Sequence, residues 1–187
     1  TTILVAGDIQ FNIEGNLHSS GPLTFTTANA SPAAGDWNGI IYAPGSSGYL
    51  NHAIVQYAEH AITLNTTHSI TIANSELRYN HYTSTTLAAG AGLYIAQGSP
   101  LITGTHVHHN IITATGEGEV YGAGIYIEGG APRIINTHVY ENTATGERAG
   151  AGGGIGIREG EAIIQNSVIT TNTIQGSAVA PYNDHVK

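Results

Sequence analysis

The fold is indicated by residues 124–142, which read Gly-Ile-Tyr-Ile-Glu-Gly-Gly-Ala-Pro-Arg-Ile-Ile-Asn-Thr-His-Val-Tyr-Glu-Asn. The same pattern of a glycine, alternating apolar residues and a closing asparagine occurs at 92–110 and at 154–172. The first two copies start 32 residues apart (92 to 124), and the last two start 30 apart (124 to 154). Internal repeats of this length predict a solenoid of stacked coils rather than a globule folded around a pocket.

Each copy contains three short strands. Ile125 and Ile127 flank Tyr126, and this period of two is typical of a strand with one buried face. Further apolar runs, around Ile134 and Val139, supply the second and third strands, and the abundance of Ile, Val, Thr and Gly disfavours helices. Three strands joined by tight turns make one coil of an all-β parallel β-helix, in which equivalent residues of successive coils lie about 4.8 Å apart.

Weaker copies extend the solenoid towards the N-terminus, so that coils lead off at positions 39, 61, 92, 124 and 154. We predict a single domain over 1–180 with about five to six coils. In it, 1–38 form the opening coils and 39–180 the repeats, while 181–187 form a C-terminal tail. The later coils carry extra residues, which we expect to emerge as loops at one corner, at 81–89, 111–121 and 143–150.

The asparagines fall into two columns, one with Asn74, Asn136 and Asn166 and the other with Asn80, Asn110, Asn142 and Asn172. Asparagine tolerates the left-handed turn conformation, and stacked amide side chains form hydrogen bonds along the axis. We therefore interpret both columns as structural. We interpret Trp37, in Gly-Asp-Trp-Asn-Gly, as a packing residue of the opening coils.

The stretch 122–142 resembles the right-handed parallel β-helix superfamily of secreted bacterial proteins. It is most similar to the surface and polymorphic-outer-membrane-protein type of Gly-Gly-Ile and Asn repeats, and the resemblance covers roughly residues 5 to 175. It implies a right-handed solenoid and an extracellular or cell-surface location, with any signal peptide already removed before Thr1. The superfamily holds lyases, glycosidases, adhesins and passive stalks, so the resemblance does not decide the activity.

Composition limits the partners. The 187 residues carry a formal net charge of −8, which disfavours nucleic acid and anionic membranes as ligands. The chain has no Cys, which excludes disulfides and thiolate metal sites. No apolar run approaches the roughly 18 residues that a membrane span needs.

Histidines gather on the third strand of the coils. If Leu77, Val107 and Val139 face inward, their neighbours face outward. Stacked coils then bring together one carboxylate and three imidazoles, those of Glu76, His106, His108 and His138. Such a set suits a transition metal such as Zn²⁺, or a proton-sensitive patch, and the alternative is a merely solvated polar face.

A second, weaker metal hypothesis concerns the extra residues of the later coils. Thr115-Gly116-Glu117 and Thr145-Gly146-Glu147 repeat at an offset of 30, with Glu119 nearby. Carboxylate oxygens in loops suit Ca²⁺, although the spacing of an EF-hand is absent. The alternative is again a set of solvated loop residues.

Tyr94 and Tyr126 align one coil apart and are expected to point outward, where they could stack on sugars, so we predict them as carbohydrate-binding residues. The three Asp residues lie outside the central repeats, which disfavours a paired-carboxylate glycosidase site. A glutamate-based site stays open, with candidates Glu128, Glu141, Glu159 and Glu161.

These features favour a non-catalytic extracellular scaffold, structural or adhesin-like, with cell-surface polysaccharide as a candidate partner. The alternative is a polysaccharide-active lyase or glycoside hydrolase, or a carbohydrate-binding module. Neither end of the solenoid shows a capping segment in the sequence. Identical chains are therefore expected to be able to stack end to end into fibres.

Overall fold

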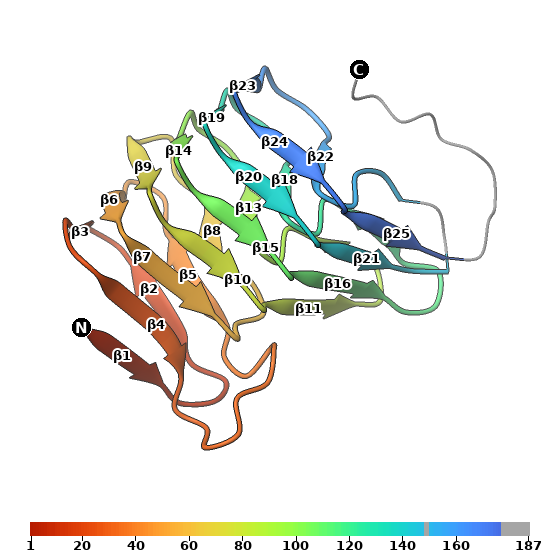
Figure 1. Ribbon diagram of the computed structural model, residues 1–187, viewed down its shortest axis with the longest axis horizontal. Coiled ribbons are helices and arrows are strands. Elements are labelled where there is room, and N and C mark those ends of the chain that lie inside the picture. The colour runs from red at the N-terminus through yellow and green to blue at the C-terminus, as the bar shows by residue number, and fades with distance from the viewer. Residues whose placement is uncertain (148–149, 177–187) are drawn as a thin grey trace.

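A computed structural model describes residues 1–147 and 150–176, which form an all-β parallel solenoid (Figure 1). The coils stack along one axis, and the described residues contain no helix and therefore none that could cross a membrane. The parallel β-helix predicted from the repeats is thus confirmed. The tail at 181–187 and the last residues assigned to the domain, 177–180, lie outside the described part of the chain.

Three parallel sheets form the walls of the solenoid. Sheet 1 has seven strands, in the order β1 (Thr2–Val5), β4 (Leu23–Thr27), β7 (Ala53–Gln56), β10 (Glu76–Arg78), β15 (His106–His108), β20 (His138–Tyr140) and β24 (Val168–Thr170). Sheet 2 has six strands, β2 (Gln10–Ile13), β5 (Gly39–Tyr42), β8 (Ile62–Leu64), β13 (Leu93–Ile95), β18 (Ile125–Ile127) and β22 (Ile155–Ile157). Sheet 3 also has six strands, β3 (Asn16–Ser19), β6 (Ser47–Asn51), β9 (Ile70–Ala73), β14 (Leu101–Thr103), β19 (Arg133–Ile135) and β23 (Ile163–Gln165).

The register of the sheets follows the offsets read from the sequence. Ile125 pairs with Leu93 on one side and with Ile155 on the other. In sheet 1, His106 pairs with Glu76 and with His138. Because equal positions stack, each column of the sequence alignment becomes a line of side chains parallel to the solenoid axis.

The main core lies between the three sheets and consists of large apolar side chains. Leu77, Val107 and Val139, which were predicted to face inward, are fully buried, and so is Ile134. Trp37 is also fully buried, with its indole N–H donating to the backbone oxygen of Gln56 at 2.9 Å. The packing role predicted for Trp37 is therefore confirmed.

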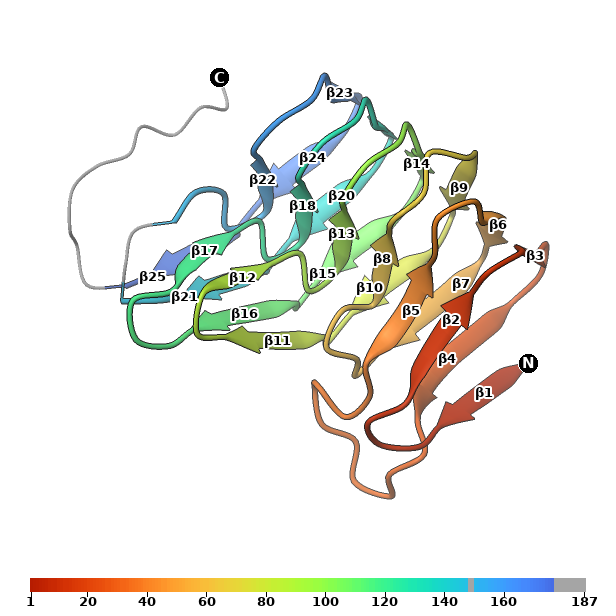
Figure 2. The same ribbon diagram turned by 180° about the vertical axis from the view of Figure 1, so that it is seen from behind.

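The extra residues of the later coils form strands rather than the loops that we expected. They leave one corner of the solenoid and build a side lobe (Figure 2). One of its sheets contains β11 (His81–Ser84), β16 (Ile111–Ala114), β21 (Thr143–Thr145) and β25 (Thr173–Gln175), and the other contains β12 (Leu87–Ala89) and β17 (Glu119–Tyr121). The side lobe has its own small core, made of Ala88, Ala91, Ile112, Ala114, Val120, Ala123 and Ala144. Burial of these apolar side chains stabilises the segments as strands. A solvated loop would have no such buried surface.

An asparagine ladder marks the corner between sheet 1 and the side lobe. The Nδ2 group of Asn80 donates to Oδ1 of Asn110 at 2.8 Å, Asn110 donates to Asn142 at 2.9 Å, and Asn142 donates to Asn172 at 2.8 Å. Backbone N–H groups of the same residues add bonds to the same oxygens, such as Asn110 to Asn142 at 3.1 Å. The ladder satisfies polar groups that the corner buries, as the structural interpretation of this column predicted.

The other asparagine column turns the chain between sheet 3 and sheet 1. Asn74, Asn136 and Asn166 have φ values of 47°, 51° and 52°, in the left-handed region that asparagine tolerates. Glycine is required just before β18 for another reason, because a Cβ on Gly124 would lie 2.7 Å from the carbonyl oxygen of Gly154. The asparagine turns and the close backbone contact at Gly124 both allow successive coils to pack closely along the axis.

Candidate functional site

The outer face of sheet 1 carries a continuous set of aromatic and imidazole rings, here called the aromatic band. It comprises Tyr57, Tyr79, His106, His108, His109, His138 and Tyr140. The outward positions of β15 and β20 supply four of these rings, and the residues that follow β7, β10 and β15 supply the other three. The stacking of His106, His108 and His138 with Glu76 that the sequence predicted is therefore present.

The rings contact one another along and across the coils. Tyr140 lies parallel to His108, with 4.7 Å between ring centroids and 10° between planes. Tyr140 also packs against His138 at 4.4 Å, and His106 and His138 lie 5.8 Å apart. On the adjoining corner, Tyr79 packs against His109 at 5.0 Å. These contacts hold the band as one surface rather than as isolated side chains.

Four charged or titratable side chains form a hydrogen-bonded chain across this surface. Glu76 Oε1 lies 2.7 Å from Nε2 of His108, and Nδ1 of His108 lies 2.7 Å from Nδ1 of His109. Nε2 of His109 lies 3.1 Å from Oε2 of Glu141. Three hydrogen bonds need three N–H groups, whereas two neutral imidazoles supply two. The chain is therefore complete when one of the two rings carries an additional proton.

The surroundings of Glu76 and His108 determine which of the two side chains is charged. Burial lowers the pKa of His108, and this effect exceeds the opposing attraction of Glu76. Burial alone would raise the pKa of Glu76, but the hydrogen bond from His108 and the charge of Arg78 together lower it. Arg78 Nη1 donates to the same oxygen of Glu76 at 3.0 Å. We therefore treat the pair as a neutral imidazole donating to an ionised carboxylate.

The structure does not bring the predicted metal ligands into a coordination set. Among residues 1–147 and 150–176, no group of three His, Asp or Glu side chains is arranged to hold a metal ion. Glu76 and His108 are hydrogen-bonded to each other, while Nε2 of His138 is buried and has no hydrogen-bond partner among the described residues. The transition-metal hypothesis stays a prediction that this arrangement does not support.

His109 and Tyr79 were missed as site residues, and Glu141 was considered only as a candidate for a glutamate-based catalytic site. They belong to a column, with Tyr57 and Thr171, in which each residue precedes the corner and has a φ between 52° and 64°. The left-handed backbone places these side chains beside the outward positions of sheet 1. Their spacing of 22, 30, 32 and 30 residues, equal to that of the strands, was the available signal.

The predicted pair Tyr94 and Tyr126 lies on the outer face of sheet 2, with 5.2 Å between ring centroids. Tyr94 donates to Glu128 at 2.8 Å and is partly exposed. Tyr126, in contrast, is only 1% exposed, because Tyr94, Tyr121 and the side lobe cover it. The prediction that Tyr126 points into solvent is therefore wrong. It assumed that residues 111–121 form a loop that leaves sheet 2 uncovered.

Between Tyr126 and the side lobe lies a pocket of about 450 Å³, lined by Thr86, Leu87, Glu119, Tyr121, Tyr126 and Arg158. Tyr121 donates to Glu119 at 3.2 Å, and Arg158 lies 3.6 Å from Glu128. Burial raises the pKa of Tyr121 and of Tyr126. The pocket combines an aromatic wall, Tyr121 and Tyr126, with one acidic and one basic side chain, Glu119 and Arg158.

The predicted calcium ligands are spread along the side lobe. Glu119 belongs to β17, while Glu117 lies in the preceding turn. Thr113 pairs with Thr145, an offset of 32, so the two Thr-Gly-Glu motifs do not stack as the offset of 30 implied. Glu147 is therefore level with Thr115 in this register rather than with Glu117.

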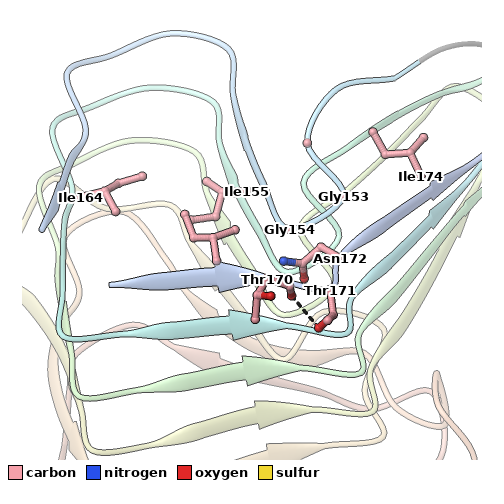
Figure 3. A pocket seen from close by; sticks show the side chains of 10 residues that line it. Gly153, Gly154, Ile155, Ile164, Thr170, Thr171, Asn172 and Ile174 are labelled. Carbon is pink, nitrogen blue, oxygen red and sulfur yellow. Dashed lines mark hydrogen bonds between the residues drawn. The ribbon is translucent and has the colours of Figure 1, made fainter. Parts of the chain in front are cut away.

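A hollow of about 550 Å³ opens at the C-terminal end of the solenoid (Figure 3), lined by Gly152, Gly153, Gly154, Ile155, Ile164, Ile169, Thr170, Thr171, Asn172 and Ile174. Ile169 is 41% exposed here, whereas Val139, one coil below it, is fully buried. Ile169 continues the column of inward side chains formed by Leu77, Val107 and Val139. It also faces inward, but no described residue covers it.

Comparison with known proteins identifies no relative. The chain matches no protein-family model, no curated protein sequence and no solved structure.

Proposed function

We propose that this chain is an adhesin-like, non-catalytic scaffold that binds a saccharide chain through the aromatic band of sheet 1. The observation that carries the proposal is the continuity of the band over four consecutive coils. Tyrosine and histidine present an apolar ring and a polar tip, which suits sugars with apolar ring faces and hydroxyl rims. The repeat resemblance supports an extracellular or cell-surface setting for this role.

The polar groups within the band fit a hydroxylated ligand. Glu76 and Glu141 offer carboxylate acceptors, and Arg78 offers donors beside Glu76. Tyr79 is 37% exposed, and the side chains of His109 and Glu141 are 41% and 50% exposed. These three side chains are therefore accessible from solvent, while His108 and Tyr140 beneath them hold their orientation.

The solenoid supports recognition by keeping these side chains rigid. The backbone of β10, β15 and β20 is paired on both edges, and the asparagine ladder fixes the corner beside it. A preorganised surface loses little conformational entropy when a ligand binds. The rigidity of sheet 1 therefore favours a binding scaffold over a flexible linker.

The test is a binding panel of soluble neutral and acidic polysaccharides, measured by calorimetry with the full chain. Tyr79→Ala should weaken binding at least tenfold, because hot-spot aromatic residues carry much of the affinity of an interface. Tyr49→Ala on sheet 3 is the matched control and should leave affinity unchanged. Reducing-end release is followed in the same samples and should stay at background.

Three outcomes of the binding experiment would contradict the proposal. One is that no polysaccharide binds, and another is that Tyr79→Ala binds like the unmodified chain. The third is that Tyr121→Ala abolishes binding while Tyr79→Ala does not, which would place the ligand in the pocket beside the side lobe. Product release that depends on Glu128 or Glu141 would instead indicate a catalytic protein.

A further inference from the structure

We propose that a groove next to the aromatic band is a further subsite for the saccharide chain, and that it selects an uncharged sugar unit rich in hydroxyl groups. The groove has a volume of about 480 Å³ and lies at the corner between sheet 3 and sheet 1. Its lining consists of His52, Ala53, Ile54, Asn74, Ser75, Glu76, Gly104 and His106. Because His106 also belongs to the band, the inference rests on the proposed function and names the class of sugar that the site takes.

A glycine interrupts the column of side chains at this corner. The column consists of five stacked positions, His52, Asn74, Gly104, Asn136 and Asn166. All five have φ between 47° and 58°. Asparagine tolerates this left-handed conformation, so the backbone does not require a glycine at position 104. Gly104 therefore differs from its neighbours only in leaving out a side chain, and it does so beside the groove.

Packing does not require a glycine at this position either. A Cβ on Gly104 would lie 2.6 Å from Oδ1 of Asn74, which is the end of an exposed side chain. A change of rotamer at Asn74 removes this contact. Asn136 and Asn166 occupy successive levels of the same column, which shows that two asparagines fit above one another here. The missing side chain at 104 is thus explained by the space that it leaves for a ligand.

The groove offers hydrogen-bond acceptors that the protein itself does not use. Oε1 of Glu76 accepts from Arg78 and from His108, whereas Oε2 accepts no hydrogen bond from the described residues. Nδ2 of Asn74 donates to Asn51 at 2.9 Å, and Oδ1 of Asn74 has no donor among residues 1–147 and 150–176. A carboxylate oxygen and an amide oxygen are acceptors only, so they fit a ligand that brings hydroxyl donors.

The charges around the groove disfavour an acidic sugar. Among the described residues, the lining contains no Lys or Arg. Arg78 lies outside the lining, and it already donates to Glu76 at 3.0 Å and to Gln56 at 2.9 Å. A carboxylate bound in the groove would therefore face the like charge of Glu76 without a cation of its own. The formal net charge of −8 adds to this repulsion.

The groove and the band form one continuous surface across sheet 1. His106 lines the groove, and its ring lies 5.8 Å from that of His138 and 6.1 Å from that of Tyr140. Ile54 pairs with Glu76 on the neighbouring strand and adds a half-buried apolar side chain. A sugar unit that places its apolar face on Ile54 and His106 would bring its hydroxyl groups to the acceptors of Glu76 and Asn74.

The experiment measures, by calorimetry with the full chain, the binding of dextran, mannan and galactan and of the carboxymethylated form of each. The neutral form should bind about tenfold more tightly than its carboxymethylated counterpart. Gly104→Asn fills the groove with the side chain found elsewhere in the column and should weaken binding of the neutral form about tenfold. Gly116→Asn is the matched control, because Gly116 also has a positive φ, 64°, and a Cβ there would meet nothing within 4 Å.

A second variant removes an acceptor without filling the groove. Asn74→Ala should weaken binding of the neutral form about three- to tenfold, through the loss of one hydrogen bond. Asn136→Ala changes the same residue type in the same column outside the lining, and it should bind normally. Circular dichroism verifies that all four variants are folded.

The outcomes separate this inference from the proposed function. Unchanged affinity in Gly104→Asn, together with weaker binding by Tyr79→Ala, would overturn the groove as a subsite and retain the band. Equal or tighter binding of the carboxymethylated forms would overturn the selection of uncharged sugars. Normal binding by Tyr79→Ala with weaker binding by Gly104→Asn would contradict the band and retain the groove. If none of these polysaccharides binds, both proposals are wrong.

Discussion

The main core and the side-lobe core belong to the same coils, but they are filled differently. The main core contains large side chains such as Ile62, Leu93 and Ile134, all fully buried. The side-lobe core is lined largely by alanine, with Ile112 as its one isoleucine among the described residues. A buried Ile or Leu contributes about 1.5–3 kcal/mol from its surface alone, and alanine much less. The difference indicates that the main core stabilises the fold and that the side lobe depends on it.

The largest effect is expected from Ile134→Ala in the main core. Loss of buried surface and the resulting cavity should lower the free energy of unfolding by about 2–5 kcal/mol, measured by urea denaturation. Ile112→Ala in the side lobe is the matched change and should fall at or below the lower end of this range, because a thin alanine-lined layer can collapse around the gap. Equal losses for the two variants would contradict the proposed dependence of one core on the other.

A change at the junction of the two cores should come next in size. Asn110 accepts two hydrogen bonds from Asn80 and donates to Asn142 and to the backbone oxygen of Leu77. Asn110→Ala leaves several of these buried groups without a partner, so we expect a loss of about 2–3 kcal/mol.

The control for this prediction is Asn172→Ala at the end of the ladder, where solvent can reach the freed groups. It should cost about 1 kcal/mol. The same denaturation experiment gives both values. If the terminal asparagine proved as important as the central one, the argument from buried hydrogen bonds would fail.

A smaller effect should come from pH and should appear first in the side lobe. The ring of His60 packs against that of Tyr82 in the side lobe, with 4.0 Å between ring centroids. His81 is the first residue of β11. Burial lowers the pKa of both histidines. It also lowers that of His108 on β15, so sheet 1 is left out of the comparison below. The unfolded chain takes up these protons near pH 6.5, whereas the folded chain does so only at lower pH. Stability is therefore complete above that pH and decreases as the pH falls below it.

Native-state hydrogen exchange at pH 7.5 and pH 5 measures this effect strand by strand. Amides of β11 and β16 should lose more protection at pH 5 than amides of β9 and β14, after correction for intrinsic exchange rates. His60→Gln should reduce the difference, and His68→Gln, at an exposed turn, should leave it unchanged. A uniform loss of protection over all sheets would contradict a separate response of the side lobe.

The same comparison explains what the sequence could predict. In the strands of the main core, isoleucine and valine alternate with other residues, as in 125–127. The repeats therefore predicted the coils, the register in which they stack and the residues that face inward. The side-lobe strands use alanine and threonine, as in Thr143–Thr145, and this composition does not distinguish a thin sheet from a loop. The burial of Tyr126 was missed for that reason, because only the three-dimensional course of the insertion covers it.

The site was predicted in part for a similar reason. The stacking of Glu76, His106 and His138 follows from register alone. The contacts of His109 depend on the left-handed backbone at the corner, φ 54°, which redirects the side chain beside sheet 1. A non-glycine residue rarely adopts this conformation, so a pattern of strands and turns does not reveal its direction.

The central claim is that the sequence offsets are the physical register of the coils, and disulfide trapping tests it most directly. The chain has no Cys, so any disulfide that forms must join the two introduced cysteines. Thr103 pairs with Ile135 across β14 and β19, at the axial spacing of about 4.8 Å that a disulfide accommodates. The pair Thr103→Cys and Ile135→Cys should oxidise rapidly in the folded chain. The pair Thr103→Cys and Arg133→Cys, two residues out of register, should stay reduced. Faster oxidation of this second pair would contradict the stacking on which both the fold and the aromatic band depend.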